Sequence, residues 1–171
     1  MKYNKIALIG MMGSGKSTIS KLLSQELNFQ MFEADEIFEQ KEDISIKEYF
    51  KIYGEESFRK KENEILKELT SKKNFVLSCG GGIVLLEENQ EILFNSDVLT
   101  IYLEAETKNI YNRIKNDNKR PLLQVENPEM EIEKILNSRK NLYQKAKIKI
   151  KTDGKSPQEI TKEILEIIWK N

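Results

Sequence analysis

The sequence predicts an α/β fold, a three-layer α/β/α sandwich around a five-stranded parallel sheet. Five short segments rich in β-branched and aromatic residues alternate with segments of helical periodicity. Alternation of this kind builds a parallel sheet with helices on both faces and right-handed crossovers. The length, 171 residues, is that of one domain with a sizeable core.

The five strands are expected where the apolar segments lie. In chain order these segments cover residues 3–9, 29–32, 75–79, 98–103 and 147–151. Ligands of open α/β sheets bind beyond the carboxyl ends of the strands. The residues that follow the first four strands are therefore expected to meet at one face.

Two stretches depart from the simple alternation. Residues 34–70 hold two or three predicted helices, an insertion large enough to cover a substrate. Residues 115–126 are polar and lack periodicity, which favours a mobile lid over an ordinary surface loop. Helix starts are signalled at 127–129 and, more strongly, at 156–159, where a capping residue precedes proline and glutamate. We expect a single domain over residues 1–171, with this insertion and this lid.

The loop after the first strand carries the most specific signal in the chain. Residues 10–17 read Gly-Met-Met-Gly-Ser-Gly-Lys-Ser, a full match to the phosphate-binding pattern G-x-x-x-x-G-K-[ST]. With a strand before it and a helix after it, the loop is expected to hold a nucleoside triphosphate at a helix N-terminus; the alternative is a chance glycine-rich turn. Lys16 would reach the β- and γ-phosphates and the Ser17 hydroxyl would ligate Mg²⁺. The nucleotide-binding candidates here are Gly13, Ser14, Gly15, Lys16, Ser17 and Thr18.

Charge and cysteine content narrow the partners and the compartment. Lys plus Arg and Asp plus Glu both total 28, so no net charge points to nucleic acid or to an anionic membrane as partner. Cys79 is the single cysteine, which excludes an internal disulfide, and we interpret it as a small buried hydrophobe. The chain shows no membrane-length apolar run, and its phosphate loop begins too early for a cleaved signal peptide. A cytoplasmic protein is expected.

The residue types also narrow the chemistry. The chain has no histidine, so imidazole bases and histidine metal sites are excluded, whereas phosphoryl transfer needs little beyond positioning and charge stabilisation. Only four of the 28 basic residues are arginines, which favours their use where a planar bidentate fork is required. They are Arg59, Arg113, Arg120 and Arg139.

Five further pieces occur in order around the phosphate loop. They are Glu33-Ala34-Asp35, Phe58-Arg59, Gly80-Gly81-Gly82, Arg120-Pro121-Leu122-Leu123 and Arg139-x-x-x-Tyr143. Together they resemble the shikimate kinases, small-molecule kinases with the phosphate loop, over nearly the whole chain. The resemblance implies a sheet of the P-loop NTPase and nucleoside-monophosphate-kinase type. It also implies transfer of the γ-phosphate of ATP, with Mg²⁺, to the 3-hydroxyl of shikimate in aromatic amino-acid biosynthesis.

The residues on the acceptor side make chemical sense by themselves. Asp35 is an acceptor suited to substrate hydroxyl groups, or a helix N-cap. Arg59 and Arg139 are candidates for a bidentate carboxylate clamp, or surface helix residues. Gly80–Gly82 offers N–H groups and close approach, or only a turn. By resemblance these residues bind shikimate, with Asp35 near the attacking hydroxyl as a catalytic residue beside Lys16 and Arg120.

On the nucleotide side, the resemblance implies that Arg120 reaches the transferring phosphate from the lid, as an arginine finger in cis. Arg113 would stack near the adenine, although it would also suit a solvated helix face. Lys155 lies in a loop that should flank the same base.

One position departs from the family pattern. Where the family has Asp-x-Asp after the second strand, this chain has Glu33-Ala34-Asp35. Glu33 is expected to support Mg²⁺, directly or through water, with a solvated strand end as the alternative. Two other functions stay open: a related kinase for another hydroxy acid such as gluconate, and a catalytically silent nucleotide-binding homologue. We expect a monomer that binds ATP and a small-molecule acceptor.

Overall fold

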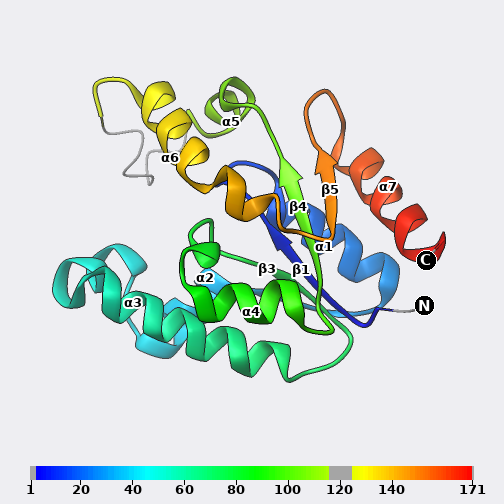
Figure 1. Cartoon of the computed structure of the whole chain (residues 1–171), viewed down its shortest axis with the longest axis horizontal. Coiled ribbons are helices and arrows are strands. Elements are labelled where there is room, and N and C mark those ends of the chain that lie inside the picture. Colours follow the sequence, from blue (N-terminus) through cyan, green and yellow to red (C-terminus); the bar gives the residue numbers. More distant parts are fainter. Residues whose placement is uncertain (1–2, 116–124, 171) are drawn as a thin grey trace.

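The computed structural model describes residues 3–115 and 125–170. A five-stranded sheet, parallel throughout, lies at its centre with the strand order β2-β3-β1-β4-β5 (Figure 1). The strands are β1 (Lys5–Ile9), β2 (Gln30–Glu33), β3 (Phe75–Ser78), β4 (Leu99–Glu104) and β5 (Ile148–Lys151). The fold class is confirmed, and each strand begins and ends within two residues of its predicted bounds.

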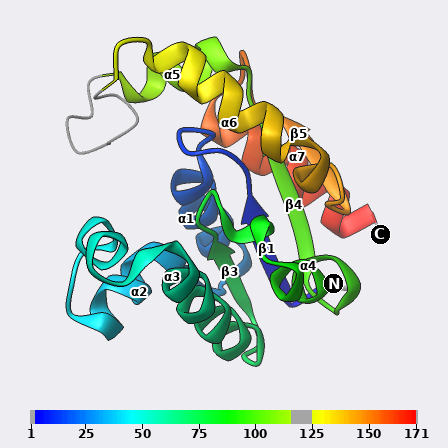
Figure 2. The same cartoon turned by 60° about the vertical axis from the view of Figure 1, so that its left-hand side comes forward.

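Helices connect the strands on both faces of the sheet. They are α1 (Lys16–Leu27), α2 (Ala34–Glu42), α3 (Ile46–Thr70), α4 (Glu87–Asn95), α5 (Thr107–Ile114), α6 (Pro128–Tyr143) and α7 (Pro157–Lys170), with a short 3₁₀ turn, η1 (Ile83–Leu85). Figure 2 shows α2 beside α3 and α5 beside α6, the two helix pairs on which the site depends.

The predicted helix starts are confirmed at atomic detail. Ser156 Oγ accepts from the N–H of Glu159 at 3.3 Å, and the Glu159 carboxylate accepts from the N–H of Ser156 at 2.7 Å, which is a reciprocal capping box. The Asn127 side chain accepts from the N–H of Met130 at 3.1 Å at the start of α6.

Side-chain alternation along the strands divides the core into two layers. In β1, Ile6 and Leu8 pack with α1 and α7, whereas Ala7 and Ile9 pack with α3, α4 and α6. All four are fully buried. Burial on both faces explains the continuous apolar runs from which the strands were predicted.

The insertion at 34–70 consists of α2 and α3, and α3 is kinked. Gly54 has φ 78° and ψ 173° inside it, a conformation that L side chains rarely adopt. The segment before Gly54 therefore points in a different direction from the segment that carries Arg59.

The predicted lid lies mostly outside the described residues, which omit 116–124. In the described part of the chain, no helix has the length and apolar character that a membrane span needs.

Candidate active site

The phosphate loop joins β1, the central strand, to α1. Gly13 and Gly15 have φ of 76° and 99°, and a Cβ on Gly13 would come within 2.7 Å of the Ile114 side chain. The Lys16 ammonium donates to the carbonyl oxygens of Gly10 and Met11 at 2.9 and 3.0 Å. These contacts hold Lys16 over the loop, at the N-terminus of α1, where a phosphate would bind.

Residues from the loops after β1, β2 and β3 line one cavity of about 570 Å³, together with Arg113 and Lys155. Its walls include Gly13, Ser14, Gly15, Lys16, Ser17, Thr18, Glu33, Asp35, Cys79, Gly81, Arg113 and Lys155. Cys79 is buried, which raises the pKa of its thiol, in agreement with its interpretation as a small apolar residue. The loops after β1, β2 and β3 thus meet as the topology rule predicts, whereas residues 105–107, which follow β4, line a separate cavity.

The glycine segment after β3 makes close contacts with charged side chains from three elements. A Cβ on Gly82 would lie 2.4–2.8 Å from the guanidinium atoms of Arg59, so that group lies against the bare backbone. A Cβ on Gly81 would lie 3.6 Å from a nitrogen of Arg139. The two arginines, from α3 and α6, therefore lie at neighbouring positions of one short segment.

Asp35 reaches the same segment from the first turn of α2. A Cβ on Gly80 would lie 2.7 Å from an Asp35 carboxylate oxygen and 3.2 Å from Glu62. The N-cap interpretation of Asp35 is wrong, because Glu33 occupies the N-cap of α2. Asp35, Arg59, Arg139 and Gly80–Gly82 are brought together as the sequence predicts.

The carbonyl groups of the glycine segment are occupied within the protein. Gly80 and Gly82 accept from the N–H groups of Ile83 and Leu85 at 3.1 and 3.0 Å. Gly81 accepts from the Tyr143 hydroxyl at 2.5 Å. Among the described residues, the N–H groups of Gly80–Gly82 have no such acceptor; Gly81 lines the cavity, whereas Gly80 and Gly82 are buried.

Glu62 belongs to this cluster and was not among the predicted site residues. Its carboxylate, 6% exposed, accepts from the Arg59 guanidinium at 2.8 Å. Burial raises the pKa of Glu62, and the charge of Arg59 opposes that rise. The available signal was its position three residues after Arg59 on one helix, but the same spacing is common on solvated faces.

Glu33 is the last residue of β2 and pairs in register with Ser78 of β3. Burial raises the pKa of its carboxyl group, while the Ser78 and Ser17 hydroxyls oppose the rise, followed by smaller effects of Asp35 and Lys16. The buried Ser78 hydroxyl makes no other hydrogen bond within the described residues. Glu33 is thus a partly buried acid beside the phosphate loop, and the solvated alternative is wrong.

The oxygen donors around Ser17 suit Mg²⁺. Ser17 and Glu33 line the same cavity, and their proximity appears in the effect of Ser17 on the Glu33 pKa. Among residues 3–115 and 125–170, no three His, Cys, Asp or Glu side chains gather as a metal cage. Mg²⁺ usually binds through one or two protein oxygens together with phosphates and water, so this small donor set fits it.

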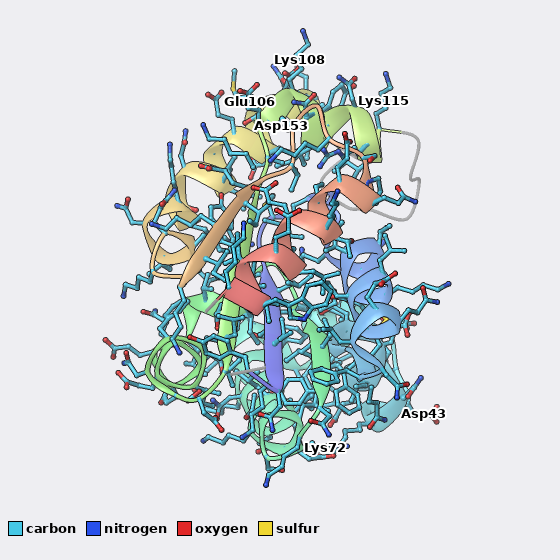
Figure 3. All side chains as sticks on the ribbon, turned by 90° about the vertical axis from the view of Figure 1, so that its right-hand side faces the viewer. Asp43, Lys72, Glu106, Lys108, Lys115 and Asp153 are labelled. Atoms are coloured by element: carbon cyan, nitrogen blue, oxygen red, sulfur yellow. The ribbon has the colours of Figure 1, made fainter. Side chains whose placement is uncertain are left out.

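Arg113 on α5 bridges two loops of the nucleotide side. Its guanidinium donates to the Gly13 carbonyl, to the Thr152 hydroxyl and to the Thr152 carbonyl, each at 3.2 Å. Asp153 holds the same loop to the start of α5, accepting from the N–H of Glu106 at 2.9 Å and from Asn109 at 2.8 Å (Figure 3). Arg113 is exposed on α5, so its proposed place near the adenine stays a prediction beside the solvated-face alternative.

Two predictions on this side have different outcomes. Lys155 lines the cavity as predicted and forms an ion pair with Glu163 at 2.5 Å. Arg120 lies outside the described residues, so its role stays a prediction.

Known proteins resemble this chain over nearly its whole length. The family model described as "Shikimate kinase" matches residues 12–169. A shikimate kinase of Thermodesulfovibrio yellowstonii is 41% identical over 161 residues, covering 94% of this chain and 92% of the relative. One from Legionella pneumophila (strain Paris) is 36% identical over 170 residues, with 99% and 97% coverage.

Solved structures agree with this similarity. Shikimate kinase from Acinetobacter baumannii in complex with shikimate superimposes with a TM-score of 0.93 at 35% identity, covering 99% of this chain and 94% of that one. A gluconokinase from Sinorhizobium meliloti 1021 has a TM-score of 0.64 at 14% identity, with 99% and 93% coverage, which shows a shared fold alone.

Proposed function

The chain belongs to the shikimate kinase family, and we propose that it transfers the γ-phosphate of ATP to the 3-hydroxyl of shikimate. One observation carries the assignment of roles: Asp35, Arg59 and Arg139 converge on Gly80–Gly82 beside the cavity of the phosphate loop. Such a cluster suits an acid that carries several hydroxyl groups.

Arg59 and Arg139 bind the carboxylate of the acceptor. Two guanidinium groups at one glycine segment offer the planar forks that a carboxylate accepts, and Glu62 holds the first of them in place. The free N–H groups of the glycines bind the acceptor's remaining oxygens.

Asp35 orients the acceptor hydroxyl and receives its proton. The hydroxyl oxygen forms a bond to the γ-phosphorus, the bond from that phosphorus to the bridging oxygen of ADP breaks, and the proton passes to the Asp35 carboxylate. Asp35 lines the cavity together with Lys16, so donor and acceptor groups share one space.

Lys16 and the N–H groups of the loop bind the β- and γ-phosphates and neutralise charge as it develops between them. Ser17 and Glu33 would hold Mg²⁺, which would offset the negative charge of the phosphates. Arg113 and Lys155 border the adenine, and Arg120 completes the phosphate contacts by the family resemblance.

Substrate profiling tests the assignment. Purified protein with MgATP is assayed for ADP release with shikimate, gluconate and a nucleoside monophosphate as separate acceptors. ADP release that requires shikimate supports the proposal. Preference for gluconate or a nucleotide would assign a related kinase, and no release with any of the three would leave a silent nucleotide-binding protein.

For oligomeric state and cellular location, the proposal keeps the two expectations from the sequence. A monomer in the cytoplasm agrees with the proposed use of two small metabolites. Sedimentation of the purified chain with and without both substrates measures the first of these properties.

A further inference from the structure

Two buried hydrogen-bonded links join the glycine segment to the helices that carry the clamp arginines. One runs from α6 to Gly81 and the other from α3 to Ile83, the residue after the glycines. The side chains that form the links are uncharged, and none of them lines the cavity of the phosphate loop. Their common property is that each crosses between elements far apart in sequence.

The first link is the Tyr143 hydroxyl. Tyr143 is fully buried, donates to the Gly81 carbonyl at 2.5 Å, and stacks on Tyr102 with ring centroids 5.1 Å apart. Burial raises the pKa of Tyr143, and the charge of Arg139 opposes that rise. Tyr143 is therefore bonded to the backbone of Gly81, the glycine that lies beside Arg139.

The second link is a pair of asparagines. The Asn63 amide on α3 donates to Asn89 at 2.8 Å, and the Asn89 amide donates to the Ile83 carbonyl at 2.9 Å. Asn63 is 7% exposed and Asn89 is fully buried. The two bonds fix the orientation of both amides. Exchanging the oxygen and nitrogen of either side chain would place two donors or two acceptors against each other.

The two links have the same arrangement. Tyr143 comes four residues after Arg139, and Asn63 comes four residues after Arg59. Residues four apart lie on one face of a helix, so each link leaves its helix from the face that carries the arginine. A shift of either helix relative to the glycine segment must break a buried hydrogen bond.

We propose that Tyr143 and the Asn63–Asn89 pair are positioning residues that set the separation of the two guanidinium groups and thereby the affinity for the acceptor carboxylate. This rests on the proposed function, since it deepens the role of Arg59 and Arg139. Positioning at this level matters because a bidentate pair requires its two partners within a few tenths of an ångström.

The first experiment removes one hydroxyl. Tyr143→Phe keeps the ring and its stacking, and the control Tyr102→Phe removes a buried hydroxyl from the partner ring. We expect Tyr143→Phe to raise KM for shikimate about tenfold, as for an unsatisfied buried carbonyl. The KM for ATP and kcat should stay within about twofold, and Tyr102→Phe should change none of the three.

The second experiment uses α3. Asn63→Ala removes the donor to Asn89, and the control Gln90→Ala removes a donor to the neighbouring carbonyl of Val84, 3.0 Å away, without a link to α3. We expect Asn63→Ala alone to raise the shikimate KM. If one variant does not fold, the other decides, because the two links are on different helices.

Double variants separate positioning from general loosening. Tyr143→Phe should have little further effect in an Arg139→Lys background and its full effect in an Arg59→Lys background; Asn63→Ala should show the reverse. Equal effects in both backgrounds, or a parallel rise in the KM for ATP, would overturn the inference while leaving the proposed function intact. If Arg59→Lys and Arg139→Lys themselves leave the shikimate KM unchanged, the clamp and this inference both fail.

Discussion

Gly82→Ala provides a sharp test of the arginine clamp, because it moves Arg59 without changing it. The backbone of Gly82 has φ −95° and ψ 3°, which alanine can adopt. The new Cβ would lie 2.4 Å from a guanidinium nitrogen of Arg59, whereas ordinary contacts begin at 3.4 Å. The guanidinium must therefore move by about 1 Å, which is sufficient to disturb a fork geometry.

The expected effect follows from the bonds that this movement weakens. A charge-assisted hydrogen bond contributes about 1.5–3 kcal/mol, so loss of one raises the KM for shikimate about tenfold to about 150-fold. Stability should change little, because the contacting atoms are the far end of a flexible side chain; we expect the unfolding midpoint to fall by no more than about 4 °C.

Steady-state ADP-release kinetics with each substrate varied in turn measure the effect, and thermal unfolding confirms the fold. Gly81→Ala is the comparison variant, since its Cβ would make only ordinary contacts of 3.5–3.6 Å, one of them with Arg139, and its effect on the shikimate KM should be smaller. Arg59→Ala should add little in the Gly82→Ala background. An unchanged shikimate KM in folded Gly82→Ala, or an equal rise in both KM values, would refute the assignment of Arg59.

Four further predictions concern the nucleotide side. Glu33→Gln should weaken Mg²⁺ dependence and lower kcat about tenfold or more, whereas Glu33→Asp should retain most activity. Activity is titrated against free Mg²⁺, and an unchanged Mg²⁺ midpoint in Glu33→Gln would contradict this prediction. Because burial raises the pKa of Glu33, its carboxylate gains a proton at higher pH than an ordinary glutamate. The acidic limb of kcat/KM for MgATP should accordingly lie above the range of an ordinary glutamate, and Glu33→Gln should remove this titration from the pH profile. Arg113→Ala breaks its contacts with Gly13 and Thr152 and should raise the KM for ATP about tenfold with the shikimate KM unchanged; the reverse pattern would contradict its assignment. Arg120→Ala should lower kcat by about 10³-fold while the Kd for ATP, from equilibrium titration, stays within about tenfold; a parallel loss would make Arg120 a ground-state ligand.

Strand positions could be predicted closely because both faces of the sheet are covered. Continuous apolar segments such as 75–79 have little alternative to a buried strand, and the residues that end them are turn formers. Helix starts at Asn127 and Ser156 follow from capping chemistry that acts within four residues. Local interactions of this kind are fully present in a single sequence.

The hydrogen bonds that hold the site residues in place could not be predicted in the same way. Asn63 and Asn89 are 26 residues apart and look like ordinary polar residues of two surface helices. Tyr143 belongs to a motif that the sequence shows, but the carbonyl group to which its hydroxyl donates lies 62 residues away. Such partners are chosen by how α3, α4 and α6 pack, which depends on the whole fold and on no local pattern.

The pairing of β1 with β3 has a consequence for insertions and deletions. Leu8 pairs with Ser78, and the N–H of Cys79 donates to the Leu8 carbonyl at 3.1 Å, so the phosphate loop and the glycine segment leave neighbouring strands at the same level. One residue added between Ser78 and Gly80 would advance the glycines by about 3.3 Å and turn each to the opposite face. The turn at residues 71–74 lies at the other end of β3, where the Asn74 carbonyl accepts from the N–H of Gln30 at 2.8 Å and no predicted site residue lies. In a library of variants of this protein, the length of the loops should therefore be varied at the amino ends of the strands. At the carboxyl ends, only the residue types should be varied.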